Sequence, residues 1–199
     1  MNEIFKTNEL NATHQSDQPS PWVSRWLHLL KPNSRALDLA CGWGRHTKLL
    51  AAQGHHVTAV DKDAAALAPL KNHAHLVHAD LEQGPWPLKG QQFDTIVVTH
   101  YLWRDRWTDL MDCLAPQGVF IYETFAQGQE TVGRPARPEF LLAHGELLQR
   151  CRHLRIVAYQ EGFLDEPARF IQRIVAVREP AHPQTPTRYA LTSRGSSLS

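Results

Sequence analysis

The octapeptide Asp38-Leu39-Ala40-Cys41-Gly42-Trp43-Gly44-Arg45 decides the fold class of this chain. It ends an apolar run over residues 35–40, which predicts a buried strand, and begins a helical pattern over residues 45–53 that stops at Gly54. The two glycines of the turn leave room for a ligand to lie against the backbone. The first N–H groups of the helix point at the same crevice, where open α/β sheets bind ligands. The stretch therefore predicts a nucleotide-type pocket.

Apolar runs alternate with helical patterns on both sides of this turn. Further strands are expected over residues 56–60, 75–78, 93–98 and 119–123, and the alternation is typical of a parallel sheet with helices on both faces. A short amphipathic helix is expected from Trp22, before the first strand, and residues 139–151 again have helical spacing. The runs 154–159 and 170–177 lie too close together for a crossover helix, so they predict an antiparallel pair.

Length and composition exclude several classes of protein. With 199 residues, 42% of them hydrophobic, and a net charge of +1, the chain predicts one domain over residues 21–178, a flexible or lid-like N-terminus over 1–20 and a flexible tail over 179–199. The balanced charge argues against nucleic-acid binding, and no apolar stretch approaches the ~20 residues of a membrane span. The polar start lacks the pattern of a signal peptide, so a cytoplasmic location is expected; nothing predicts the oligomeric state.

Asp38 decides which nucleotide suits the pocket. A carboxylate at the end of a buried strand is costly unless a cation or hydrogen-bond donors compensate it, and it would repel a pyrophosphate. Thr47 also stands where a dinucleotide fingerprint has its third glycine. S-adenosyl-L-methionine, with an ammonium, a sulfonium and no phosphate, fits these demands. The alternative is that Asp38 is a turn or helix-capping residue of another α/β protein.

Two more acidic residues follow successive predicted strands. Asp61 lies about 20 residues after the glycines, where a carboxylate accepts hydrogen bonds from ribose hydroxyls; alternatively, it caps the next helix, a role that suits Asp63 better. Asp80 follows the third strand, where it can accept from the amine of adenine while the N–H of Leu81 donates to the ring; alternatively, it is a loop residue. Three acidic strand ends around one turn favour an adenosyl ligand.

The motifs resemble those of class I S-adenosylmethionine-dependent methyltransferases. These motifs are LDLACGWGR (37–45), VTAVDKD (57–63), HADLE (78–82), FDTIVVTHYLW (93–103) and LAPQGVFIYE (114–123). Together with RPEFLLAHGELL (137–148), they are most similar to small bacterial methyltransferases related to the tellurite-resistance group. The resemblance implies an α/β, Rossmann-like, doubly wound sheet of seven strands with the last antiparallel, and methyl transfer from S-adenosyl-L-methionine.

The site residues expected from these patterns fall into two groups. The cofactor-binding group is Asp38, Ala40, Gly42, Gly44, Arg45, Asp61, Lys62, Asp80, Leu81 and Thr99. Tyr101 is expected to orient a small-molecule acceptor or, alternatively, to pack against the next helix. Arg134 and Arg137 are expected to attract an anionic acceptor, with a solvated loop as the alternative. The histidines show no metal-ligand spacing, so no metal is expected. A non-catalytic S-adenosylmethionine-binding module and an NAD-type oxidoreductase remain as other functions.

Overall fold

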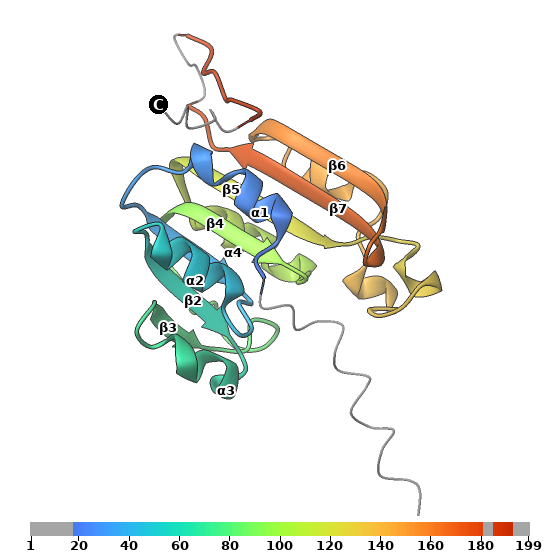
Figure 1. The fold of residues 1–199 in the computed structure, drawn as a ribbon, viewed down its shortest axis with the longest axis horizontal. Helices are drawn as coiled ribbons and strands as arrows, with labels where there is room; N and C mark the ends of the chain where they lie inside the picture. Colours follow the sequence, from blue (N-terminus) through green and yellow to red (C-terminus); the bar gives the residue numbers. More distant parts are fainter. Residues whose placement is uncertain (1–17, 181–184, 193–199) are drawn as a thin grey trace, which may run out of the picture.

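The computed structural model describes residues 18–180 and 185–192. Most of the expected N-terminal segment (1–17) and parts of the expected tail (181–184 and 193–199) lie outside the described residues. Within the described part, seven strands form one sheet in the order β3-β2-β1-β4-β5-β7-β6 (Figure 1). The strands are β1 (Arg35–Leu39), β2 (His56–Asp61), β3 (His75–His78), β4 (Phe93–Thr99), β5 (Leu114–Phe125), β6 (Arg155–Asp165) and β7 (Ala168–Val177).

The strand directions confirm the predicted fold class. Strands β1 to β5 pair in parallel, whereas β7 runs antiparallel between β5 and β6. The helices are α1 (Pro21–Arg25), α2 (Arg45–Ala52), α3 (Ala64–Leu67), α4 (Trp107–Asp112) and α5 (Glu146–Arg150), with 3-10 turns η1 (Leu27–Leu29), η2 (Ala68–Leu70), η3 (Arg104–Arg106), η4 (Gln129–Thr131) and η5 (Pro138–Phe140). No helix in the described residues is long and apolar enough to cross a membrane.

The helices cover both faces of the sheet. Trp22 and Trp26 from the α1 region pack with Leu50 of α2 against one face, and these helices lie in front of the sheet in Figure 1. Trp107 of α4 and Leu147 of α5 pack on the other face. Strand residues alternate between the two layers, so the sheet is buried on both sides, as expected for parallel strands.

Local sequence signals explain where several helices begin and end. Ser20 caps α1 by accepting a hydrogen bond from the N–H of Trp22 at 3.1 Å, and Pro21 occupies the first helical position, where proline is favoured. Asp63 caps α3, and Pro69 coincides with the change from α3 to the 3-10 turn η2. Helix α1 agrees with the short helix predicted from Trp22 before the first strand.

The helix predicted over residues 139–151 is wrong for its first half. The backbone of Leu142 pairs with Phe125 and Gln127 at the end of β5, and the guanidinium of Arg104 takes the carbonyls of Glu139 and Leu141. These contacts take up backbone groups that a helix would need, so only α5 is helical beyond η5. The helical pattern arises because Leu141, Leu142 and Leu147 are all buried, although in different local structures.

Strand β5 is longer than predicted. Leu114 already pairs with Phe93, and the pairing continues at Val119 opposite Thr95, so residues 115–118 form an irregularity within the strand. Strands β6 and β7 also extend beyond their predicted ends and form a long hairpin, which projects at the side of the sheet labelled β6 in Figure 1. The predicted antiparallel pairing of these two strands is confirmed.

Candidate functional site

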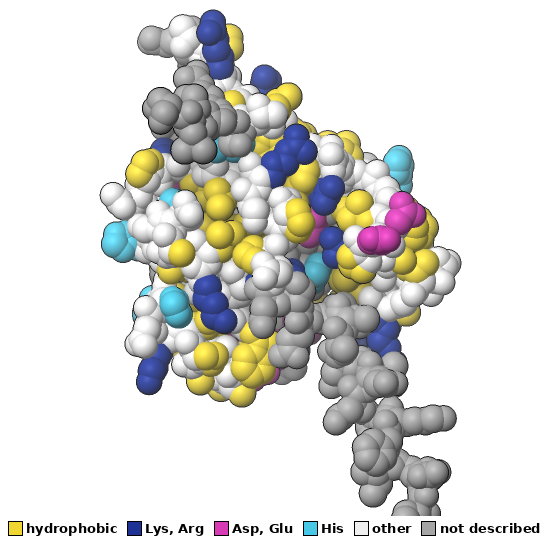
Figure 2. All heavy atoms as spheres, in the orientation of Figure 1, with side chains coloured by type: hydrophobic (Ala, Val, Ile, Leu, Met, Phe, Trp, Pro, Cys, Tyr) yellow, Lys and Arg dark blue, Asp and Glu magenta, His cyan; other side chains and the backbone are white. Residues whose placement is uncertain are grey.

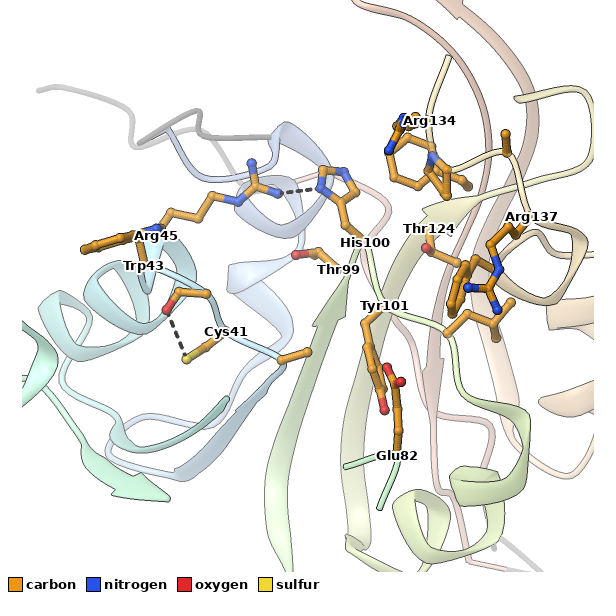
Figure 3. A pocket seen from close by; sticks show the side chains of 17 residues that line it. Cys41, Trp43, Arg45, Glu82, Thr99, His100, Tyr101, Thr124, Arg134 and Arg137 are labelled. Atoms are coloured by element: carbon orange, nitrogen blue, oxygen red, sulfur yellow. Dashed lines mark hydrogen bonds between the residues drawn. The ribbon is translucent and has the colours of Figure 1, made fainter. Parts of the chain in front are cut away.

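A cavity of about 760 Å³ lies at the C-terminal ends of β1, β4 and β5. This volume is within the range of small-molecule sites. The cavity is lined by Ala40, Cys41, Gly42, Trp43, Arg45, Glu82, Thr99, His100, Tyr101, Leu102, Thr124, Phe125, Arg134, Pro135, Ala136, Arg137 and Phe140. Figure 3 shows the turn after β1 on one side and the arginine-bearing loop after β5 on the other. The structure thus brings the predicted turn and the predicted loop to one pocket.

The turn after β1 has the left-handed backbone that its glycines permit. Ala40, Gly42 and Gly44 have φ angles of 53°, 52° and 73°, so β1 ends at Leu39 rather than at Ala40. A Cβ atom added to Gly42 would meet no atom within 4 Å, which leaves open space at the pocket wall. A Cβ atom on Gly44 would instead lie 2.4 Å from the methyl carbons of Leu70. Gly42 therefore leaves room for a ligand, whereas Gly44 permits close packing of α2 on η2.

Asp38 lies beneath α2 and is not among the residues that line the cavity. Its side chain is 1% exposed, and its carboxylate accepts a hydrogen bond of 2.6 Å from the Thr47 hydroxyl. Burial raises the pKa of Asp38 to about 6, although hydrogen bonds from the side chain and backbone of Thr47 oppose the increase. Thr47 is the third residue of α2, so these contacts resemble those of a helix-capping carboxylate. Through these contacts, Asp38 fixes the first turn of α2, where Arg45 is the first residue.

Asp61 joins the turn after β1 to the end of β2. Its carboxylate accepts a hydrogen bond of 2.7 Å from the N–H of Gly42 and one of 2.9 Å from the N–H of Asp63. Asp63, rather than Asp61, caps α3. The neighbouring Lys62 is exposed, and its carbonyl contacts a ring nitrogen of His78 at 3.0 Å. Asp61 and Lys62 are not among the residues that line the cavity, but Asp61 is bonded directly to Gly42, which is.

The loop after β3 reaches the cavity through Glu82. Asp80 is half-buried and accepts a hydrogen bond of 2.9 Å from the N–H of Glu82, while the side chain of Leu81 is 4% exposed and belongs to the core. Of these three, only Glu82 is among the lining residues. Asp80 and Leu81 therefore hold the loop that presents Glu82.

Thr99, His100 and Tyr101 follow one another at the end of β4 and line the cavity together. The ring of His100 stacks on Phe125, with centroids 4.9 Å apart. Its Nδ1 atom is 3.5 Å from the Arg45 guanidinium, and a dashed line marks this contact in Figure 3. Burial lowers the pKa of Arg45, while the charge of Glu123 opposes that decrease. An arginine therefore faces the pocket from the start of α2.

Tyr101 is a buried donor at the cavity wall. Within the described residues its hydroxyl has no hydrogen-bond partner. Burial and the negative charge of Glu82, which Figure 3 shows next to Tyr101, raise the pKa of the phenol above its usual range. Tyr101 therefore keeps its proton at neutral pH. Its backbone carbonyl accepts a hydrogen bond from the Tyr122 hydroxyl, which fixes the residue to β5.

Arg134 and Arg137 both line the cavity, but their surroundings differ. Arg137 is exposed, pairs with Glu139 and lies over the ring of Phe140, 4.9 Å from its centroid. In the described part of the chain, no acidic side chain pairs with the guanidinium of Arg134. Arg134 therefore carries the uncompensated positive charge of this loop.

Sequence patterns did not point to several lining residues. Glu82 is the last residue of the HADLE motif, but only Asp80 and Leu81 of that motif were expected in the site, and Thr124, Phe125 and Phe140 belong to apolar segments typical of a core. Trp43, in the turn after β1, also lines the cavity, whereas the indole N–H of Trp86 donates to the sulfur of Cys113 at 3.4 Å. The described residues contain no cluster of three metal-ligating side chains.

The face of the molecule drawn in Figure 2 shows no large concentration of charge. On the face seen in Figure 2, Lys and Arg side chains are scattered among polar and apolar atoms rather than arranged in one continuous band. This distribution matches the near-neutral net charge of +1. The arrangement that suggests a ligand is therefore the cavity itself.

Comparisons with known proteins agree with this geometry. A family model described as a methyltransferase domain matches residues 36–118, which run from the second residue of β1 through β4 and include the turn after β1. No curated protein sequence matches the chain significantly. The matched segment contains the whole β1 turn, Asp61, Asp80 and the end of β4, but neither Arg134 nor Arg137.

Solved structures share the fold at low sequence identity. TehB from Haemophilus influenzae has a TM-score of 0.58 at 21% identity over 73% of this chain, which spans only 57% of that protein. A TehB-like S-adenosylmethionine-dependent methyltransferase from Corynebacterium glutamicum has a TM-score of 0.56 at 20% identity, covering 75% of this chain and 83% of the other. The 1,6-didemethyltoxoflavin-N1-methyltransferase of Burkholderia thailandensis has a TM-score of 0.55 at 21% identity, covering 74% and 72%. Residues 36–118 thus resemble a methyltransferase domain, and the described part of the chain has the fold that these methyltransferases share.

Proposed function

We propose that this protein transfers a methyl group from S-adenosylmethionine to a small, anionic acceptor. The observation that carries the proposal is the cavity of about 760 Å³, bounded by the glycine turn after β1 and by the arginine-bearing loop after β5. The first boundary belongs to the matched methyltransferase segment. The toxoflavin methyltransferase is described with a small molecule and S-adenosylhomocysteine bound, so a fold of this kind accommodates both.

The residues around the turn fit an adenosyl ligand. Gly42 leaves open space at the wall, and the carboxylate of Asp61 is fixed by two backbone N–H groups at the adjoining strand end. We assign the ribose to Asp61 and Lys62, and the adenine to Asp80 and Leu81. The methionyl end is assigned to the remaining predicted residues, which are Ala40, Gly42, Gly44, Arg45 and Thr99. The buried Asp38 acts beneath them.

The protein's own contribution to the reaction is alignment and exclusion of water. S-adenosylmethionine carries its methyl group on a positively charged sulfonium sulfur. When the methyl group is transferred, the rest of the molecule leaves as a neutral thioether, so an aligned nucleophile needs little further activation. Tyr101 keeps its proton because of its raised pKa, so it orients the acceptor as a hydrogen-bond donor and does not act as a base. Phe125 and Phe140 give the acceptor region apolar walls.

Binding of S-adenosylhomocysteine tests the cofactor assignment. Wild-type protein should bind it in calorimetric titration, and Asp61→Asn should raise the Kd at least about tenfold, since a charged acceptor for the ribose hydroxyls is lost. Asp63→Asn is the matched control, because Asp63 is exposed and caps α3 rather than joining the turn. Equal Kd values for wild type and Asp61→Asn would contradict the assignment, and binding of NAD in place of S-adenosylhomocysteine would favour an oxidoreductase.

The acceptor's charge is tested through Arg134 and Arg137. In a screen of anionic, neutral and cationic small molecules with S-adenosylmethionine as the donor, we expect the protein to methylate anionic compounds. The double variant Arg134→Ala, Arg137→Ala should then raise the KM of that acceptor about tenfold or more, while the Kd of S-adenosylhomocysteine stays unchanged.

A control for this double variant is Arg152→Ala, Arg155→Ala. It removes the same charge at two exposed positions that do not line the cavity. An equal rise of KM in both double variants would show that the effect comes from the change in net charge. It would contradict the proposed contact of Arg134 and Arg137 with the acceptor. Donor binding without any methylated product would favour a module that only binds S-adenosylmethionine.

A further inference from the structure

His46 lies buried between the backbone of Ser20 and the hydroxyl of Thr99. It is the second residue of α2, and its side chain is 1% exposed. The Nε2 atom is 3.0 Å from the backbone nitrogen of Ser20, and the Nδ1 atom is 3.4 Å from Oγ1 of Thr99. A backbone N–H can only donate, so Nε2 accepts and carries no proton. A neutral ring then carries its proton on Nδ1 and donates it to Thr99.

The ring is neutral under ordinary conditions. Burial lowers the pKa of His46 to about 3, and the positive charge of the neighbouring Arg45 acts in the same direction. The ring therefore has one proton at neutral pH, and the contact with Ser20 determines which nitrogen holds it. His46 is held in a single tautomer.

Ser20 is itself fixed by two further contacts. Its hydroxyl accepts from the N–H of Trp22 as the cap of α1 and donates to the carboxylate of Glu123 at 3.0 Å. Glu123 is 1% exposed and is also 3.3 Å from the guanidinium of Arg173. The backbone N–H of Ser20 thus has a fixed direction toward His46.

The tautomer of His46 decides what Thr99 presents to the cavity. Because Oγ1 of Thr99 accepts from His46, the hydroxyl hydrogen is left to donate elsewhere, and the described residues include no second hydrogen-bond partner for it. Thr99 lines the cavity together with Arg45, whose guanidinium also only donates. Two donors, one of them positively charged, face the same turn.

An anion is the ligand group that satisfies both donors. The methionyl end of S-adenosylmethionine has a carboxylate, and the proposed function places that end at this turn. We propose that Arg45 and the hydroxyl of Thr99 form the seat of the methionyl carboxylate, and that His46 is a positioning residue that directs the Thr99 hydroxyl toward it. This inference rests on the proposed function.

Two probes separate this inference from the proposed function. S-adenosylhomocysteine carries the carboxylate, whereas 5′-methylthioadenosine has the same adenosine and thioether but no amino-acid part. We expect Thr99→Val to raise the Kd of S-adenosylhomocysteine roughly tenfold and to leave the Kd of 5′-methylthioadenosine unchanged, since only the first probe loses a charge-assisted hydrogen bond. Thr99→Ser, which retains the hydroxyl, should bind both probes like wild type.

Two variants of His46 form a matched pair. Gln at this position has an amide that reaches the place of Nε2 and can accept from Ser20, but it has no group near Thr99. Asn has its amide at the place of Nδ1 and can still donate to Thr99. The relevant quantity is the Kd of S-adenosylhomocysteine divided by the Kd of 5′-methylthioadenosine. We therefore expect His46→Gln to raise this ratio, as Thr99→Val does. His46→Asn should leave that ratio close to wild type.

The wild-type protein provides a direct readout of the tautomer. In ¹⁵N NMR, the chemical shifts of the His46 ring should show an unprotonated Nε2 and a protonated Nδ1. A protonated Nε2 would overturn the inference, as would a wild-type Kd ratio in both Thr99→Val and His46→Gln. If wild type binds neither probe, the proposed function fails; if it binds both and the ratio does not move in the variants, only the carboxylate seat fails.

Discussion

Gly44→Ala should lower the free energy of unfolding by about 3 kcal/mol, because the new methyl group is strained and overlaps Leu70. The φ angle of Gly44 is 73°, where an L-residue other than glycine costs about 1–2 kcal/mol. Its added Cβ would lie 2.4 Å from both methyl carbons of Leu70, which is fully buried. Leu70 has no solvent-facing space to occupy, so the neighbouring core must shift. Urea unfolding followed by circular dichroism measures the loss.

Gly42→Ala is the matched control for this prediction. Gly42 has a similar φ of 52°, but its added Cβ would meet nothing within 4 Å, so only the backbone strain of about 1–2 kcal/mol applies. Leu70→Ala should also cost less in the Gly44→Ala background than in wild type, because it removes the overlap. Equal losses for Gly42→Ala and Gly44→Ala would show that Leu70 accommodates the methyl group.

Glu146→Gln should cost about 3 kcal/mol of unfolding free energy at pH 7, on the order of its pKa shift. Both oxygens of Glu146 are 2.8 Å from the guanidinium of Arg104, and Arg150 and the N–H of Ala143 bind the same carboxylate. Burial alone would raise the pKa of Glu146, but these hydrogen bonds outweigh it and lower the pKa to about 2. Arg104 also holds the carbonyls of Glu139 and Leu141, so this carboxylate anchors the loop beside the cavity.

The sign of the pH dependence follows from the lowered pKa. The stabilisation by Glu146 is fully present above its ordinary pKa of 4.5 and is lost as the pH falls through about 2. Wild type should therefore lose stability between these pH values more steeply than Glu146→Gln, in urea unfolding measured at a series of pH values. Glu139→Gln is the control, because the pair of Glu139 with Arg137 is exposed and contributes little. Parallel pH curves for wild type and Glu146→Gln would refute this prediction.

Much of the fold could be predicted because its signals are local. The strands β1 to β4 are apolar runs that stop at polar or glycine residues, and Gly42 and Gly44 identify the turn after β1. The spacing of the last two runs was enough to predict their antiparallel pairing. The helix expected over residues 139–151 was wrong in its first half because the contacts of Arg104 are tertiary, and sequence spacing carries no information about them.

The position of the cavity in the fold could also be predicted from the sequence. Residues in the glycine turn and at the strand ends follow from topology, since the ends of parallel strands meet at one edge of the sheet. The direction of a side chain does not follow: Asp38 was expected to face the ligand, but its carboxylate is bonded to Thr47. His46 also gave no signal beyond its place at a helix start, because its contact with Ser20 joins residues that lie 26 positions apart in the chain.

The three cysteines of the chain are all buried and unpaired. Cys41 lies in the turn after β1, Cys113 contacts Trp86, and Cys151 ends α5. Burial raises the pKa of each thiol, to about 12 for Cys151, so reaction with an alkylating reagent is slow while the surrounding structure is closed. The rate at which each thiol is alkylated therefore measures how often its region opens, and a bound ligand that closes the turn would slow Cys41 more than the other two.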